Sequence, residues 1–296
     1  LNVHVLGGCC GTTPEYLSKT IELVKDLPIE PPVKKNISVV TSFSQAVEIG
    51  PKPVIIGERI NPTGKKKFKQ ALRDGDINYI LSEGLKQEDA GAHILDVNVG
   101  LPEIDEPKMM VEVMKKLQSV IALPLQIDTS DPIALEAALR HYNGKAMINS
   151  VNGKQESMDA VFPLVKKYGG VVVGLALDEE GIPDNATDRI RIAKKIYKEA
   201  SKYGIEPKDI VIDGLAMTIS SDPTSAIATL ETLRIIRDEL HGHSILGVSN
   251  ISFGLPQRPI INANFFTMAM QSGLSCAIIN PSSEAMMKSY RAYLAL

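Results

Sequence analysis

The sequence predicts an α/β protein built as a (β/α)8 barrel, and two observations lead to this fold. Short, near-continuous apolar runs alternate with helical stretches eight times over about 240 of the 296 residues, which is the rhythm and size of such a barrel. Several of these runs end directly in Asp or Asn. Because the carboxyl ends of barrel strands converge on one mouth, we expect a ring of polar side chains around one pocket.

The individual elements follow from apolar runs bounded by Gly, Pro and polar residues. Strands are predicted at 54–56, 94–98, 123–127, 146–148, 171–176, 210–212, 245–248 and 277–279. Helices are predicted at 76–90, 107–118, 132–141, 158–168, 187–203, 224–241, 262–272 and from 283 onward. A doubly wound open sheet is the competing fold, but it seldom has eight units without a Gly-rich nucleotide turn, and none follows the first strand.

Residues 1–35 are predicted to be separate from the barrel, which we place at 36–296. They comprise a strand-like stretch at 1–6, a turn at 7–11, a helix at 15–26 and a Pro-rich linker at 27–33. We interpret them as the last β/α unit of a second barrel plus a connector, so this chain is expected to be a piece of a longer protein. Residues 37–50 are ambiguous: they allow a strand at 37–40 and a short helical turn at 43–47.

Composition excludes several classes of protein. The net charge of −3 gives no electrostatic footprint for nucleic acid, and no apolar run approaches the roughly 20 residues that span a bilayer. The one basic run, 65–67 with Lys69, is predicted as a loop or helix start that could attract an anionic substrate tail. Cys9, Cys10 and Cys276 are an odd number of cysteines with two adjacent, which does not suit a disulfide framework and favours a cytoplasmic setting.

Polar residues at the strand ends are candidates for ligand binding. Asp128, Asn149, Asp213 and Asn250 each directly continue an apolar run, and weaker candidates near the first two runs are Glu58, Asn61, Asp96 and Asn98. Any one of them alone could simply cap a helix or satisfy a loop amide. Together, two carboxylates in a barrel mouth imply a ligand with hydrogen-bond donors, because a buried carboxylate without a partner is unfavourable. A flat nucleoside-like or pterin-like ring fits these acceptors, whereas a phosphate does not.

Six motifs at these strand ends resemble the pterin-binding family, which includes dihydropteroate synthases and methyltetrahydrofolate methyltransferases. They read GERINPTG at 57–64, LDVNVG at 95–100, QIDTS at 126–130, INS at 148–150, VIDG at 211–214 and VSNISFG at 248–254. The resemblance covers the chain from about residue 50 to its end. The synthases have a Ser-Arg-Lys type ending after the seventh strand, whereas this sequence has Ser249 and Asn250, as in the methyltransferases.

The resemblance implies a barrel that binds 5-methyltetrahydrofolate and passes its N5-methyl group to cob(I)alamin on a separate domain. Asp128, Asn149 and Asp213 would then hydrogen-bond the pterin ring, with Asn250 near N5. A tertiary amine is a poor leaving group, so N5 needs a proton or a strong hydrogen bond as the C–N bond breaks. Asn250 cannot donate a proton, so we expect it to be catalytic through electrostatic assistance. Arg258 could contact the aminobenzoate or glutamate tail, or could be an ordinary surface arginine.

The run GGCCGTTP at 7–14 resembles the last strand and helix of a homocysteine-binding zinc barrel, in which two adjacent cysteines and a third from an earlier strand hold the metal. A homocysteine barrel, a linker and a folate barrel follow one another in this order in the cobalamin-dependent methionine synthases. The resemblance implies two partners in the same longer chain, a homocysteine-binding barrel and a cobalamin-binding domain. Cys9 and Cys10 would bind zinc only with that upstream barrel, since a catalytic zinc site uses three protein ligands. Cys276 is predicted to be a buried core residue.

Three alternatives stay open. A pteroate-condensing synthase could use the same barrel, although the missing lysine after Ser249 argues against it. A methyltransferase that serves a separate corrinoid protein is possible, although the GGCC run weighs against it. A non-catalytic folate-binding module would bind folate without transferring a methyl group.

Overall fold

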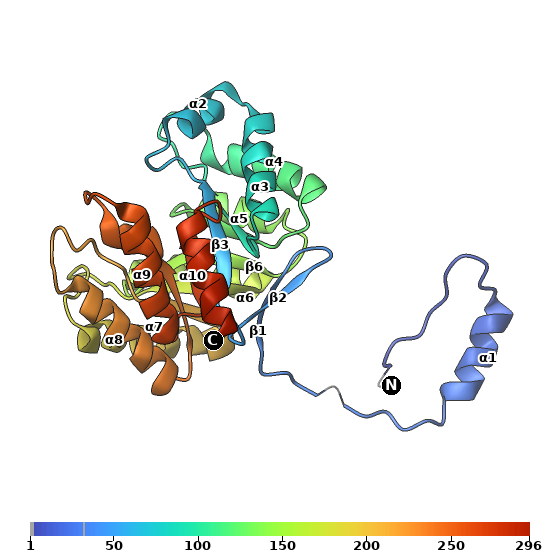
Figure 1. Cartoon of the computed structure of the whole chain (residues 1–296). Helices are drawn as coiled ribbons and strands as arrows, with labels where there is room; N and C mark the ends of the chain where they lie inside the picture. The colour runs from blue at the N-terminus through green and yellow to red at the C-terminus, as the bar shows by residue number, and fades with distance from the viewer. Residues whose placement is uncertain (1–2, 32) are drawn as a thin grey trace. The chain divides into compact units, whose positions relative to one another are not determined.

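The computed structural model describes residues 3–31 and 33–296, and the chain divides into two units, Leu1–Asn36 and Ile37–Leu296. In the first unit, helix α1 (Pro14–Val24) begins at a proline and buries no residue, which confirms the predicted helix (Figure 1). The predicted strand at 1–6 is wrong over residues 3–6, which have no regular structure; residues 1 and 2 lie outside the described residues, as does residue 32 of the linker. A strand needs a neighbour to satisfy its backbone, and the described part of this unit offers none.

The second unit is a closed (β/α)8 barrel, also called a TIM barrel, as predicted. Over residues 37–296 its parallel strands are β3 (Val54–Ile60), β4 (Ile94–Val97), β5 (Leu125–Asp128), β6 (Ala146–Asn152), β7 (Gly170–Leu175), β8 (Ile210–Asp213), β9 (His243–Gly247) and β10 (Cys276–Ile279). Neighbours in sequence are neighbours in the barrel, and β10 closes it by pairing with β3.

Helices cover the outside of the barrel, as Figure 1 shows. They are α2 (Lys66–Asp74), α3 (Ile77–Asp89), α4 (Glu106–Val120), α5 (Pro132–Leu139), α6 (Gln155–Tyr168), α7 (Ala186–Lys202), α8 (Ser225–Asp238), α9 (Arg258–Gln271) and α10 (Glu284–Ala295). Two short 3₁₀ turns, η1 (Pro207–Asp209) and η2 (Val248–Ser252), flank β8 and β9. Within the described residues, no helix is both long and apolar enough to traverse a bilayer.

The interior of the barrel is apolar toward the amino-terminal ends of its strands. One buried cluster joins side chains from seven different strands, which can meet only inside the barrel: Val54, Ile56, Ile94, Met147, Val171, Val173, Val211, Ile245 and Cys276. Outward-facing strand residues such as Leu95 and Val97 instead join helix residues such as Met110 and Leu117 in a second cluster. Because side chains alternate between the two faces of each strand, the residue two positions after an interior residue also points inward.

A hairpin closes the amino-terminal end of the barrel. Strands β1 (Ser38–Thr41) and β2 (Ala46–Ile49) pair antiparallel, and Val40 and Ile49 join the interior cluster. The predicted helical turn at 43–47 is wrong, because the Ser42 hydroxyl accepts the N–H groups of residues 44 and 45 and turns the chain back into a second strand.

Gly144 is needed where this hairpin meets the barrel. A Cβ on Gly144 would lie 2.3 Å from the carbonyl oxygen of Thr41, and its φ is +149°. The close approach lets Lys145 and Thr41 exchange hydrogen bonds of 2.9 and 2.8 Å.

Candidate functional site

The carboxyl ends of the strands bring the predicted polar residues to one mouth of the barrel. Glu58 lies on β3, Asp96 on β4, Asp128 on β5, Asn149 on β6 and Asp213 on β8. Four of them follow a residue of the interior cluster by two positions, as Asp213 follows Val211, and Asp128 follows buried Gln126 in the same way. All five therefore point inward above the apolar part of the interior.

Asp128 is the centre of the best-defined contacts in this mouth. Its Oδ2 accepts hydrogen bonds from Nδ2 of Asn98 at 3.0 Å and Nδ2 of Asn61 at 3.3 Å. The amide oxygens of both asparagines accept backbone N–H groups, from Gly100 and Thr63, which fixes their orientation. Among the described residues, the hydrogen bonds to this carboxylate all go to Oδ2, so Oδ1 is left for a ligand.

Burial changes the ionisation of this part of the site. Burial and, to a smaller extent, the charge of nearby Glu106 raise the pKa of Asp128 to about 6, against the opposing hydrogen bond from Asn98. The pKa of Asp96 is raised well above its ordinary range by burial and by the neighbouring charge of Asp128. A hydrogen bond of 2.6 Å from Nε2 of Gln126 to Oδ1 of Asp96 opposes that shift. The two carboxyls therefore hold protons more readily than carboxyls in water.

Asp213 lies at the same mouth but on β8, whereas Asp128 lies on β5. Burial raises its pKa to about 6, while a 2.7 Å hydrogen bond from the backbone N–H of Leu215 and the charge of Arg189 oppose the shift. Arg189 is itself buried and donates to the carbonyl oxygens of Gly214 at 2.8 Å and Leu215 at 3.1 Å. It thus fixes the loop that directly follows Asp213. Asn149 pairs in register with Asp128 across β5 and β6, which places these two residues side by side.

Asn250 lies on η2, just beyond β9, and is exposed. Its Nδ2 folds back over Gly247, where a Cβ would come within 2.9 Å of it. Arg258 lies in the first turn of α9, which begins four residues earlier than the predicted helix at 262–272. Its guanidinium contacts the Asn250 turn, through Oγ of Ser252 and the carbonyl oxygen of Ser249, each at 2.9 Å.

Glu58 faces this turn from β3. Burial raises the pKa of its carboxyl, and the charges of Lys65, Arg59 and Arg258 and a hydrogen bond with Ser249 oppose the shift. Lys65 donates from Nζ to the carbonyl oxygens of Glu58 at 3.0 Å and Asn61 at 3.2 Å. The sequence analysis placed Lys65 in a basic run that could attract a substrate tail, but missed these contacts with the mouth. It also missed Gln126, although a polar residue two positions before Asp128 in an apolar run is a readable signal.

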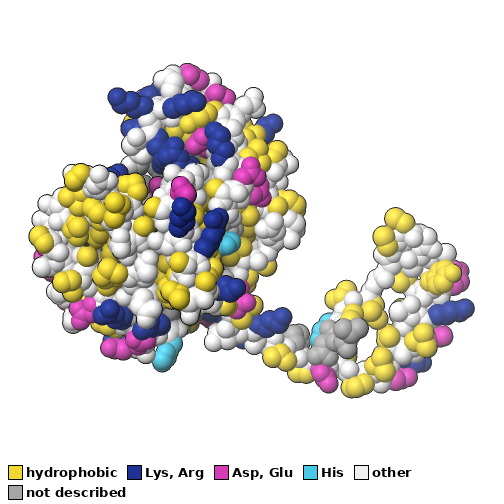
Figure 2. All heavy atoms as spheres, viewed as in Figure 1, with side chains coloured by type: hydrophobic (Ala, Val, Ile, Leu, Met, Phe, Trp, Pro, Cys, Tyr) yellow, Lys and Arg dark blue, Asp and Glu magenta, His cyan; other side chains and the backbone are white. Residues whose placement is uncertain are grey.

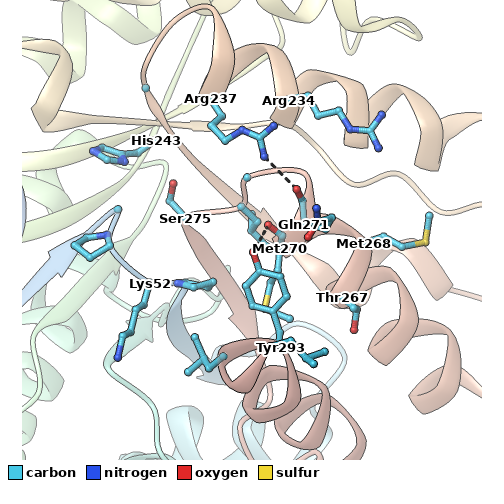
Figure 3. A pocket seen from close by; sticks show the side chains of 18 of the residues that line it. Lys52, Arg234, Arg237, His243, Thr267, Met268, Met270, Gln271, Ser275 and Tyr293 are labelled. Atoms are coloured by element: carbon cyan, nitrogen blue, oxygen red, sulfur yellow. Dashed lines mark hydrogen bonds between the residues drawn. The ribbon is translucent and has the colours of Figure 1, made fainter.

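Two cavities compete as the ligand site. The smaller, of about 440 Å³, lies beside the polar mouth and is lined by Asp128, Asn149, Asn152 and Leu175 among others. The larger groove, of about 1180 Å³, lies at the end of the barrel where the strands begin. Its lining includes Lys52, Arg234, Arg237, His243, Gln271 and Tyr293 (Figure 3). Two of its polar side chains pair with the protein itself, as Figure 3 shows for Arg237 with the carbonyl oxygen of Gln271 and for Tyr293 with that of Met270. Chemistry therefore favours the smaller cavity, despite its size.

The first unit carries the predicted metal ligands. Cys9 and Cys10 are free and exposed, with their Sγ atoms 3.8 Å apart. The described residues contain no group of three or more His, Cys, Asp or Glu side chains that could hold a metal ion. Two thiolates fall short of the three ligands of a catalytic zinc site, so zinc binding by this chain stays a prediction that depends on a third ligand from elsewhere. Cys276 is free and buried within β10, as predicted.

Comparisons with known proteins agree with this geometry. The family described as pterin binding enzyme matches residues 57–280. Methionine synthase from Mycobacterium tuberculosis is 31% identical over 300 residues, which are 95% of this chain and 25% of that protein. The methylcorrinoid:tetrahydrofolate methyltransferase of Eubacterium limosum is 34% identical over 240 residues, 79% of this chain and 87% of that protein. This chain thus spans about a quarter of the length of the methionine synthases it matches.

Solved structures of dihydropteroate synthases have the same fold. The enzyme from Yersinia pestis superposes with a TM-score of 0.66 at 15% identity, over 87% of this chain and 98% of that one. The enzyme from Xanthomonas albilineans, in complex with 7,8-dihydropteroate, gives a TM-score of 0.67 at 18% identity with the same coverage. At these identities the likeness concerns the fold alone.

Proposed function

Because the chain belongs to the pterin binding enzyme family, we propose that it binds 5-methyltetrahydrofolate and transfers the N5-methyl group to cob(I)alamin. The observation that carries the proposal is the Asp128 carboxylate, which is oriented by two amides and keeps Oδ1 for a ligand. A pterin ring offers an amino group and ring N–H donors to such an acceptor. The two methyltransferases among the relatives support methyl transfer over other pterin chemistry.

Each mouth residue has a role in this proposal. Asp128, Asn149 and Asp213 hydrogen-bond the pterin ring, while Asn250 lies near N5. Other predicted residues hold these ligand-binding side chains in place. Asn61 and Asn98 orient Asp128. Asp96 lies beneath Asp128 and is hydrogen-bonded by Gln126, while Glu58 faces the Asn250 turn. The basic helix α2, over which Figure 2 shows Lys and Arg side chains gathered, is suited to attract the anionic glutamate tail.

When held on another domain, cob(I)alamin would supply the nucleophile that accepts the methyl group as the C–N5 bond breaks. The bonding electron pair would stay on N5, which would take up a proton from solvent water. Asn250 has no acidic proton to give, but its amide oxygen can accept a hydrogen bond from the protonated N5 and stabilise that charge. Asn250 and Phe253 are both exposed at the mouth, so a corrinoid held on another domain can reach the methyl group from outside.

The setting of this reaction is proposed to be methionine synthesis from homocysteine. The match to methionine synthase covers 95% of the chain, and residues 7–14 contain the adjacent cysteines Cys9 and Cys10, which a neighbouring homocysteine-binding barrel would use. The partners would then be a homocysteine-binding barrel and a cobalamin-binding domain in the same longer protein, in the cytoplasm, as the free thiols suggest. The relative from Eubacterium limosum, of which 87% is covered, favours a second candidate: methyl exchange with a separate corrinoid protein.

Two product assays with the same preparation test the proposed reaction. One mixes the chain with labelled 5-methyltetrahydrofolate and free cob(I)alamin, and measures labelled methylcobalamin. The other supplies a dihydropterin pyrophosphate and p-aminobenzoate, and measures dihydropteroate. We expect methylcobalamin and no dihydropteroate. Dihydropteroate would show a condensing synthase, and folate binding without either product would show a binding module.

A further inference from the structure

The turn that carries Asn250 needs support from outside itself. Asn250 lies in the middle of η2, a five-residue 3₁₀ turn (Val248–Ser252), and its side chain is exposed. Short 3₁₀ segments have poor internal hydrogen-bond geometry, so they hold a side chain less firmly than an α-helix does. A group that stabilises charge at N5 must nevertheless be placed to within a fraction of an ångström.

Arg258 supplies this support through three contacts around Asn250. Its Nη2 donates to the carbonyl oxygen of Ser249 and its Nε to Oγ of Ser252, each at 2.9 Å. Its Cζ lies 4.7 Å from the centroid of the Phe253 ring, in a cation–π contact. The contacts thus fall on the residue before Asn250 and on the second and third residues after it.

The anchor points of Arg258 are themselves fixed. Ser252 is fully buried, and α9, whose first residue is Arg258, packs against η2. The carbonyl oxygen of Phe253 accepts hydrogen bonds from Oγ1 of Thr218 at 2.8 Å and Oγ of Ser220 at 2.9 Å. The Asn250 turn is therefore tied to the loop after Asp213 on one side and to α9 on the other.

The guanidinium also balances charge at the mouth. Its positive charge favours the ionised form of Glu58, which hydrogen-bonds with Ser249 in the same turn. Two of the donor directions of Arg258 are occupied by the turn, and its planar face is occupied by Phe253. These contacts use two of the five guanidinium N–H donors and one face of its plane, so they commit much of the group to the turn rather than to a folate tail.

We infer that Arg258 is a positioning residue, which holds the Asn250 amide at N5 by clamping Ser249, Ser252 and Phe253. It affects transfer in this way only if the chain carries out the proposed methyl transfer. A direct role in binding the glutamate tail is the competing explanation, and the two differ in what they predict for rate, affinity and substrate length.

The test compares Arg258→Met, Arg258→Lys and the matched control Arg234→Met, which removes an arginine at the opposite end of the barrel. Single-turnover transfer to free cob(I)alamin and calorimetric affinity are measured with 5-methyltetrahydrofolate and with 5-methyltetrahydropteroate, which lacks glutamate. We expect Arg258→Met to lower the transfer rate about 100-fold with both substrates and to change the affinity less than about threefold. Arg258→Lys keeps the charge but not the planar fork, so an intermediate loss is expected.

A double-variant cycle shows whether Arg258 acts through Asn250. On an Asn250→Ala background, Arg258→Met should lower the rate less than about threefold further, because the group it positions is already gone. A full additional loss would overturn the inference. So would a loss of affinity that disappears with the tail-less substrate, since that outcome identifies Arg258 as a tail ligand.

Hydrogen exchange separates this inference from the proposed function. In Arg258→Met, backbone amides of residues 248–254 should exchange faster than in the unaltered chain, whereas Arg234→Met should leave them unchanged. This readout needs no methyl transfer: faster exchange supports the clamp even if the unaltered chain transfers no methyl group, which would contradict only the proposed function. Unchanged exchange in Arg258→Met would overturn the clamp.

Discussion

Asn98 donates a hydrogen bond of 3.0 Å from Nδ2 to Oδ2 of Asp128. The two residues come from the ends of adjacent strands, and the backbone N–H of Gly100 holds the Asn98 amide in the donating orientation. This contact stabilises the ionised carboxylate against the burial that raises the pKa of Asp128 to about 6. The carboxylate is thus kept as an acceptor, in a fixed direction, before any ligand arrives.

Removal of this amide should weaken folate binding. We expect Asn98→Ala to lower the affinity for 5-methyltetrahydrofolate about tenfold, because a hydrogen bond to a charged group is lost. The pKa of Asp128 should rise at the same time, so the pH midpoint of binding should move upward. Calorimetric titrations at several pH values measure both effects. Asn264→Ala, which removes an amide that donates within α9, should change neither; an unchanged midpoint in Asn98→Ala would contradict the role given to this contact.

Folate binding should release protons near pH 6. Burial raises the pKa of both Asp128 and Asp213 to about 6, and pterin donors favour the ionised carboxylates, so binding should lower both values. Affinity should therefore rise as the pH increases through about 6 and then level off. Calorimetry at pH 6 in buffers of different ionisation enthalpy counts the protons, and Asp213→Asn should release fewer. Proton uptake on binding would contradict this account.

The same shift has a consequence for the unliganded protein. The ordinary pKa of an Asp carboxyl is 3.8, so between about pH 4 and pH 6 the folded chain binds more protons than the unfolded chain, and these carboxyls reduce stability as the pH rises. Asp213→Asn should therefore raise the melting temperature above pH 6 and have little effect near pH 4. A lower melting temperature of Asp213→Asn above pH 6 would show instead that the fold itself stabilises Asp213 as an anion.

Asn250 should matter more for rate than for binding. Because it is proposed to stabilise charge that develops only at N5, Asn250→Ala should lower the single-turnover transfer rate about 100-fold and change the folate affinity less than about threefold. Rapid-mixing kinetics and calorimetry on the same preparation separate the two effects. A transfer rate equal to that of the unaltered chain would remove Asn250 from the mechanism.

The contact between hairpin and barrel should be sensitive at Gly144. We expect Gly144→Ala to lower the free energy of unfolding by about 2–3 kcal/mol, because the methyl group would overlap the carbonyl oxygen of Thr41 and φ is unfavourable for alanine. Gly204→Ala is the matched control, since its φ is +77° but nothing lies within 4 Å of the added methyl group. It should lose only about 1 kcal/mol. Equal losses of unfolding free energy in the two variants, measured by denaturant unfolding, would show that the hairpin shifts to accommodate the added methyl group without destabilising the fold.

The sequence predicts the barrel and its mouth because each strand is buried on both sides. Such strands are continuous apolar runs, and the inward period of two continues past the last apolar residue, as from Val211 to Asp213. The hairpin was harder to predict, because β1 and β2 are only partly buried and therefore lack the continuous apolar runs of the barrel strands.

The contacts within the mouth could not be read from the sequence. Asn61 and Asn98 approach Asp128 because the strand register brings the ends of β3, β4 and β5 together. Nothing in their spacing along the chain selects Asp128 over Asp96. The role of Arg258 depends on the 3₁₀ turn and on the start of α9. This helix begins at Arg258, four residues before the helix that the apolar pattern predicts. The larger groove is built from segments far apart in the chain, which no local motif marks.

The central claim is that the carboxyl-terminal mouth binds the folate ring, and calorimetric titration with 5-methyltetrahydrofolate tests it most directly. Three variants accompany the unaltered chain: Asp128→Asn at the mouth, Arg237→Met in the larger groove and Asp74→Asn on the exposed end of α2. We predict one folate bound per chain, an affinity about 100-fold weaker in Asp128→Asn and nearly unchanged in the other two. Absence of binding to the unaltered chain, or a loss confined to Arg237→Met, would contradict the claim.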